Sequence, residues 1–123
     1  MPGDAMGVLL ISGGHERAHY AFMLAVAGVA MGRDVVVFAT NEGCRGLTAA
    51  AAADPREAVV VSTGVAGLDE LRAVAIDSGV RLMACDSGLR MAGLEPSVLL
   101  AGVDVTGLPA FLSAVGRGQI VTV

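Results

Sequence analysis

Residues 80–94 read VRLMACDSGLRMAGL, and this stretch decides the fold class that we predict. Val80–Ala84 is short and mostly apolar, and Gly79 stands before it, as is typical of a strand buried on both faces. Cys85 follows at the C-terminal end of that strand, directly before a short helix predicted for residues 86–92. A strand that runs into a helix in this way is one unit of a parallel α/β sheet.

The N-terminal part of the chain repeats the same pattern. Val8–Ile11 is an apolar run that ends at Ser12-Gly13-Gly14, and His15–Met31 is rich in apolar residues and stops at Gly32, a typical residue after a helix C-terminus. Asp34–Phe38 is a second β-branched run. Strand, helix and strand with burial on both faces indicate a parallel sheet with right-handed crossovers. We predict a three-layer α/β/α fold with a mainly parallel five-stranded sheet.

The remaining segments complete a single domain that spans residues 1–123. Leu68–Ser78 has the period of an amphipathic helix, with Asp69, Glu70, Arg72 and Asp77 on its polar face. The other predicted elements are a polar loop over Thr40–Cys44, a short Ala-rich helix over Gly46–Ala53, strands over Ala58–Ser62, Val103–Val105 and Gln119–Val123, and a helix over Leu108–Val115. These give five or six strands, and the placement of Ala58–Ser62 in the sheet is open.

Composition excludes several classes of function. The formal net charge is −4, and all eight basic residues are arginines scattered along the chain, which argues against nucleic-acid binding. The absence of lysine excludes Schiff-base chemistry and a P-loop phosphate site. We predict no metal and no cofactor.

Hydrophobic residues make up 54% of the chain, more than one small domain needs for its core. The longest apolar run, Ala21–Met31, is shorter than the roughly 20 residues of a membrane-spanning helix. The surplus therefore indicates subunit interfaces, and we expect a homo-oligomer with no membrane partner. Met1–Met6 has no basic residue before the apolar stretch, so we expect a cytoplasmic protein.

Cys85 is the main candidate for chemistry. A thiol at the N-terminus of a helix is stabilised as thiolate by the helix dipole and by nearby N–H donors, and a thiolate is the form that attacks sulfur. The same residue could instead fill space as a small buried side chain. The residues alone leave both interpretations open.

The segment Leu82–Leu94 resembles the cysteine segment of the DsrE/DsrF/DsrH-like sulfur-transfer family. Glu16–Phe38 is similar to the first helix and second strand of that family, Leu68–Val80 to the helix before the cysteine strand, and Val103–Val123 to its C-terminal helix and last strand. The resemblance implies a five-stranded parallel fold, homo-oligomers, and a cysteine, here Cys85, that carries persulfide sulfur. It also implies relay partners such as rhodaneses and small TusA-type carriers.

Around Cys85 we predict a pocket that includes Asp86, Ser87 and Gly88 and is shaped by Gly13, Gly14 and His15. The N–H groups of Ser87 and Gly88 stabilise negative charge on the sulfur. Cys44 follows the second strand and is a possible second thiol that resolves a persulfide or accepts its sulfur. Its alternative interpretation is an incidental loop cysteine.

Three other motifs compete with this assignment. His15–His19 matches the HExxH pattern of zinc peptidases, but no third ligand occurs at the metzincin spacing. Gly13-Gly14 is too short for a dinucleotide fingerprint, and Arg90 lies one position short of the Cys-x5-Arg spacing of cysteine phosphatases. The rival function is a non-catalytic oligomeric module that binds a small ligand or a partner at the same strand edge.

Overall fold

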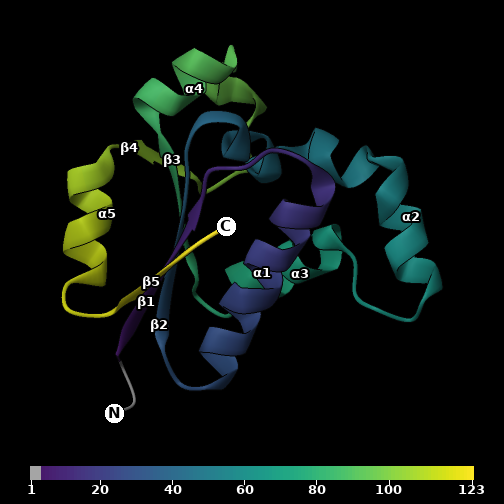
Figure 1. The fold of residues 1–123 in the computed structure, drawn as a ribbon, viewed down its shortest axis with the longest axis horizontal. Coiled ribbons are helices and arrows are strands. Elements are labelled where there is room, and N and C mark those ends of the chain that lie inside the picture. The colour runs from purple at the N-terminus through teal and green to yellow at the C-terminus, as the bar shows by residue number, and fades with distance from the viewer. Residues whose placement is uncertain (1–3) are drawn as a thin grey trace.

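The computed structural model describes residues 4–123, so the first three residues of the N-terminal segment considered above lie outside it. Its centre is a five-stranded sheet in which all strands are parallel and the order is β4-β3-β2-β1-β5 (Figure 1). The strands are β1 (Ala5–Leu10), β2 (Asp34–Ala39), β3 (Arg81–Cys85), β4 (Asp104–Thr106) and β5 (Gln119–Thr122). This confirms the predicted α/β fold class.

Helices cover the two faces of the sheet unequally. Helices α1 (His15–Ala30), α2 (Pro55–Ser62) and α3 (Leu68–Asp77) lie on one side, and α5 (Leu108–Val115) lies on the other (Figure 1). Helix α4 (Asp86–Ala92) lies at the C-terminal end of β3. Within residues 4–123, three 3-10 helices connect these elements: η1 (Asn41–Leu47), η2 (Ala49–Ala53) and η3 (Pro96–Val98). The fold is therefore three-layered, with one layer made by a single short helix.

The core divides into two clusters, one on each face of the sheet. The larger one lies under α1 and α3 and contains Phe22, Leu68 and the inward residues of β1 and β2. The smaller one lies under α5, where the rings of Phe38 and Phe111 stack with centroids 5.0 Å apart. A Cβ at Gly7 would lie 2.5 Å from Val115, so glycine lets α5 approach β1. Cys85 belongs to this second cluster.

Most predicted helices and strands are confirmed, and their ends agree with the structure to within a few residues. The segment from residue 40 to 62 differs from the prediction. The predicted loop Thr40–Cys44 is mostly 3-10 helix, and the Ala-rich segment Gly46–Ala53 is split between η1 and η2. The predicted strand Ala58–Ser62 is wrong, because these residues belong to helix α2. Asp54 caps that helix by accepting the Arg56 N–H at 2.8 Å, and Pro55 occupies its first turn.

The distribution of polarity on α3 also differs from the prediction: Val74, predicted on the apolar face, is 41% exposed, and Arg72 departs in the opposite direction. Arg72 was predicted on the solvent face, but only 2% of it is exposed. Its guanidinium donates to the carbonyl oxygens of Gly46 and Thr48, at 2.9 and 2.7 Å. Arg72 therefore holds the junction of η1 and η2 against α3.

Over residues 4–123, no helix combines the length and the apolar character that crossing a lipid bilayer requires.

Candidate functional site

Cys85 lies where β3 ends and α4 begins. It is the last residue of the strand and the residue that precedes the first turn of the helix, with extended backbone angles. It is 6% exposed, and its neighbours in the core are the residues under α5. The structure therefore places the thiol at the C-terminal edge of a parallel sheet, where the sequence predicts it.

Hydrogen bonds around Cys85 favour its thiolate. Burial alone would raise the pKa of the Cys85 thiol, but the side chains of Ser87 and Thr40 and the N–H groups of Gly88 and Ser87 lower it by more. The Ser87 Oγ lies 3.3 Å from the Cys85 Sγ. The net effect is a pKa below the ordinary value, as expected for a thiol aimed at helix N–H donors.

The close packing of the end of β2 against α4 requires glycine at position 88. A Cβ there would lie 2.5 Å from both the Asn41 nitrogen and the Thr40 Oγ1. Gly88 therefore allows the end of β2 to pack directly against the first turn of α4. This close approach brings Thr40 to the Cys85 sulfur, a contact between segments far apart in the chain.

Cys85 borders an open cavity of about 500 Å³, which we call the Cys85 cavity. Its other lining residues are Asp86, Ser87, Thr106, Gly107 and Leu108. Thr106 is the partner of Cys85 across β3 and β4, and Asp86 is paired with Arg90 at 2.7 Å on the surface of α4. Cys85 thus borders open space at the C-terminal edge of the sheet.

Cys44 has a different environment. It is fully buried in the cluster under α1 and α3, whereas Cys85 belongs to the cluster on the opposite face. Burial, followed by the negative charge of Cys85, raises the pKa of Cys44 to about 11. At neutral pH its thiol is therefore protonated and shielded from solvent.

The residues predicted around the first strand do not join Cys85. Gly14 and His15 line a second cavity, which shares no residue with the Cys85 cavity. Gly13 packs instead against Glu42, whose Cβ would lie 3.0 Å from a Cβ at that position. The predicted pocket is thus divided: Asp86 and Ser87 border the sulfur, Gly88 supplies an N–H, and Gly14 and His15 lie elsewhere.

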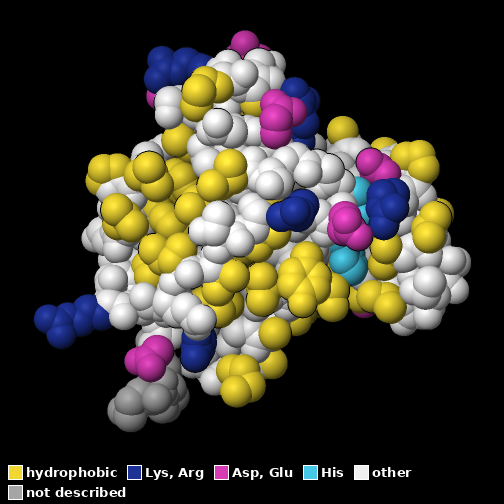
Figure 2. Space-filling view, viewed as in Figure 1, with side chains coloured by type: hydrophobic (Ala, Val, Ile, Leu, Met, Phe, Trp, Pro, Cys, Tyr) yellow, Lys and Arg dark blue, Asp and Glu magenta, His cyan; other side chains and the backbone are white. Residues whose placement is uncertain are grey.

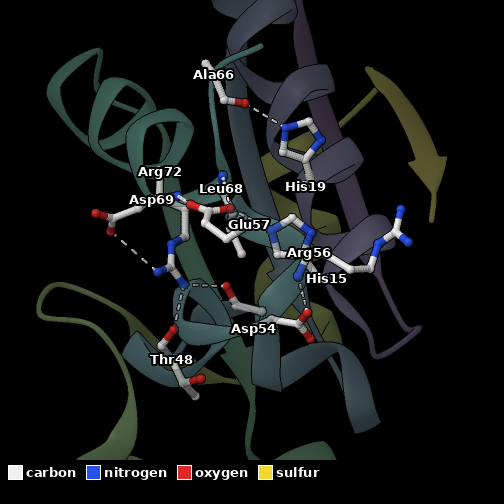
Figure 3. A network of polar contacts seen from close by, with 11 residues as sticks. His15, His19, Thr48, Asp54, Arg56, Glu57, Ala66, Leu68, Asp69 and Arg72 are labelled. Atoms are coloured by element: carbon white, nitrogen blue, oxygen red, sulfur yellow. Dashed lines mark hydrogen bonds and ion pairs between the residues drawn. The ribbon is translucent and has the colours of Figure 1, made fainter. Parts of the chain in front are cut away.

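The HExxH histidines form a structural network with α2 and α3 (Figure 3). Nε2 of His15 lies 2.6 Å from Oε1 of Glu57, and Nε2 of His19 lies 2.8 Å from the Ala66 carbonyl oxygen. Glu16 is exposed and faces Arg56 at 3.7 Å. Within residues 4–123 no group of three or more His, Cys, Asp or Glu side chains is placed to hold a metal.

Glu57 is the centre of that network and was missed by the sequence interpretation. Its carboxylate accepts the N–H groups of Leu68 and Asp69 at 2.9 and 3.0 Å, and so caps α3 from the neighbouring helix α2. Burial opposes the charge, but these N–H groups and His15 lower the pKa of Glu57 to about 2. The Asp54-Pro55 pair, a typical start of a helix, was the available signal for α2.

The fold and site define a class of protein: a parallel three-layer α/β domain with a hydrogen-bonded cysteine at the end of an inner strand. A sequence model of the DsrE/DsrF-like family matches residues 6–123. The chain therefore belongs to the DsrE/DsrF-like family, which is related to sulfur relay.

Two solved structures share the fold over nearly their whole length. The ychN protein of E. coli superposes with a TM-score of 0.75 at 13% sequence identity, covering 98% of this chain and 99% of its own. The protein of unknown function MTH1491 of Methanobacterium thermoautotrophicum gives 0.58 at 20% identity, covering 98% and 100%. Among curated proteins, none is significantly similar in sequence. At these identities the structural likeness establishes the fold alone.

Proposed function

We propose that this protein is an intracellular sulfur carrier, with sulfurtransferase-like chemistry, that holds persulfide sulfur on Cys85 and relays it between proteins. The observation that carries the proposal is the hydrogen-bonded Cys85 thiol, with its pKa below the ordinary value, at the border of an open cavity. Membership of the DsrE/DsrF-like family supports it.

Loading is a transfer of neutral sulfur between thiols. The Cys85 thiolate attacks the outer sulfur of a donor persulfide, a new S–S bond forms at Sγ, and the S–S bond of the donor breaks to release its thiolate. Delivery is the reverse step, in which an acceptor thiolate attacks the outer sulfur and Cys85 leaves as thiolate. No electrons are gained or lost overall, so neither step calls for a cofactor.

The low pKa of Cys85 serves both directions. It raises the fraction of the attacking thiolate during loading, and it makes Cys85 a better leaving group during delivery. The Ser87 hydroxyl and the N–H groups of Ser87 and Gly88 supply this stabilisation. The outer sulfur of a loaded Cys85 has space in the Cys85 cavity, beside Thr106 and Gly107.

We assign Cys44 no part in the relay. Its thiol is protonated at neutral pH and has no exposed surface. The donors and acceptors are therefore thiols of other proteins, such as rhodaneses or TusA-type carriers, that reach Cys85 through its cavity.

We also propose that the protein is a homo-oligomer, because α5 carries apolar side chains on its outer surface. Leu108 and Leu112 are 50% and 53% exposed, and hydrophobic side chains gather over α5 at the left of Figure 2. Val105, on the edge strand β4, and Ile120, on the opposite edge strand β5, are also exposed. Exposed apolar surface of this kind is typical of protein interfaces.

The test is to load the protein with glutathione persulfide and to map the added sulfur by mass spectrometry. We expect one added sulfur on the Cys85 peptide, released by cyanide as thiocyanate, in the wild type and in Cys44→Ser but not in Cys85→Ser. Sulfur on Cys44, or on neither cysteine, would contradict the proposal. A Ser87→Ala variant should load more slowly than wild type near pH 6, with the difference closing at high pH.

A further inference from the structure

Thr40 follows the last residue of β2 and lies beside Cys85 at the edge of the sheet. The register of β2 and β3 pairs Ala39 with Ala84, the residues just before these two. The Thr40 backbone is held on both sides, because its N–H donates to the end of β1 at 2.9 Å and its carbonyl oxygen accepts an N–H of η1 at 2.9 Å. The backbone therefore fixes Thr40 as a neighbour of the cysteine.

The Thr40 hydroxyl has two acceptors within its reach. In the structure it donates to Oδ1 of Asn41 at 2.8 Å. The same hydroxyl is one of the groups that lower the pKa of the Cys85 thiol. A hydroxyl carries a single hydrogen, so it donates to one of these acceptors at a time. A bond to Asn41 and a bond to the sulfur therefore exclude each other.

Asn41 is suited to give up this hydrogen. Its backbone has a φ of 53°, and within residues 4–123 it is the only residue other than glycine with a positive φ. Asparagine adopts this left-handed conformation more readily than most residues. Asn41 is exposed, so water can replace the hydroxyl as the donor to Oδ1. The hydrogen can therefore leave Asn41 without stranding a buried acceptor.

The charge on the sulfur decides between the two acceptors. A thiol sulfur is a weak acceptor, whereas hydrogen bonds to a charged acceptor are roughly twice as strong as neutral ones. The hydroxyl therefore stays on Asn41 while Cys85 is protonated or carries an outer sulfur. It turns to Sγ when Cys85 becomes a thiolate.

We propose that Asn41 and the Cys85 sulfur share the single hydrogen of the Thr40 hydroxyl, and that Asn41 is a positioning residue that releases this hydrogen as negative charge develops on Sγ. Asn41 thus competes with Cys85 for the donor. Its removal makes the thiolate easier to form, and removal of the hydroxyl makes it harder to form. The use of this hydrogen bond in sulfur delivery rests on the proposed relay, but the competition for the hydrogen does not.

The charged groups near the sulfur are unchanged in the variants that test this proposal. Asp86 is paired with an arginine of α4 at 2.7 Å, and Glu42 is paired with an arginine of η1 at 2.7 Å. Burial raises the pKa of Cys44, which is neutral at pH 7. On β4 the charged residue, Asp104, is exposed and lies two residues before the partner of Cys85, and α5 has no charged residue. A changed titration of Cys85 therefore reports on the hydroxyl.

The test is the pH dependence of iodoacetamide alkylation at Cys85, mapped by mass spectrometry. We expect Thr40→Val, or Thr40→Ala if valine disturbs the fold, to raise the pKa of Cys85 by at least about 0.5. Asn41→Gly keeps the left-handed backbone and should lower that pKa by at least about 0.3. Thr40→Ser keeps the hydroxyl and should titrate as wild type does. Thr122→Val, at an exposed threonine on the far edge strand β5, is the control and should leave the pKa unchanged.

The double variant Thr40→Val/Asn41→Gly decides the mechanism, because Asn41 acts only through the hydroxyl. We expect its Cys85 pKa to equal that of Thr40→Val. A decrease on Asn41→Gly that is the same with and without the hydroxyl, or an increase, would overturn the competition. An unchanged pKa in Thr40→Val would reject the role of the hydroxyl.

Persulfide loading separates this inference from the relay. If the variants titrate as expected but glutathione persulfide adds no sulfur to Cys85 of the wild type, the relay is wrong and the shared hydrogen stands. If loading occurs and the variants titrate as wild type does, the shared hydrogen is wrong and the relay stands.

Discussion

Replacing Glu57 by glutamine tests a carboxylate that accepts hydrogen bonds from two other segments of the fold. The carboxylate joins three helices, because it extends from α2, caps the first N–H groups of α3 and accepts from His15 on α1. Glutamine keeps the shape and one acceptor oxygen but removes the charge. We expect the variant to fold with lower stability.

The magnitude follows from the pKa of Glu57, which falls from an ordinary 4.5 to about 2 in the fold. At about 1.4 kcal/mol per unit, the charged form contributes about 3 kcal/mol to the free energy of unfolding. The folded pKa is below the unfolded one, so this contribution is complete above about pH 4.5 and is lost as pH falls toward 2. We expect Glu57→Gln to lose about 2–3 kcal/mol at pH 7.

Urea unfolding from pH 2 to 7 checks both the size and the pH range. The difference between wild type and Glu57→Gln should be largest above pH 5 and should shrink between about pH 4.5 and 2. Glu95→Gln, at an exposed glutamate, is the control and should stay within about 0.5 kcal/mol of wild type. A difference that is the same at every pH, or equal in the two variants, would refute the reasoning.

Three further predictions concern packing, titration and assembly. Gly88→Ala places a Cβ 2.5 Å from the Asn41 nitrogen, so we expect the free energy of unfolding measured in urea to fall by about 1–3 kcal/mol. Gly107→Ala is the control: its Cβ meets nothing closer than 3.6 Å, so its free energy of unfolding should change little. The pKa of the Cys44 thiol is raised in the folded state, so the stability of the wild type should fall as pH rises from about 9 to 11. The Cys44→Ala variant should lack that fall. The unfolding midpoints of the two proteins across this pH range check the prediction. Leu112→Glu puts a charge on the exposed apolar surface of α5, which we propose as a subunit interface, so light scattering should show smaller particles for the variant than for the wild type. If the wild type is itself a monomer, the proposed oligomer is wrong.

The sheet and the position of Cys85 could be predicted because both depend on local patterns. Buried parallel strands are short apolar runs, and the residue between such a run and a helix start lies at the C-terminal edge of the sheet. The helix α2 was mistaken for a strand because Val59–Val61 have β-branched side chains. The Asp54 cap, Pro55 and the contact of Glu57 with α3 override that preference, and Val59 and Val61 remain largely exposed.

The parts of the site that escaped prediction depend on contacts between distant segments. Thr40 reaches Cys85 only because Gly88 lets β2 approach α4, and no local pattern encodes that approach. Arg72 has the spacing of a solvent-facing residue, but its partners are carbonyl groups of the η1–η2 junction. His15 was expected beside Cys85 because both follow strands at one sheet edge, yet the side chain turns toward α2.

The rate of alkylation by iodoacetamide, measured on each cysteine from pH 5 to 11, tests the central claim most directly. The account predicts that Cys85 reacts with a midpoint below its ordinary pKa, that Ser87→Ala moves this midpoint upward, and that Cys44 remains unreactive at neutral pH. A Cys85 midpoint at or above about 8.5, or faster reaction of Cys44, would contradict a relay through Cys85.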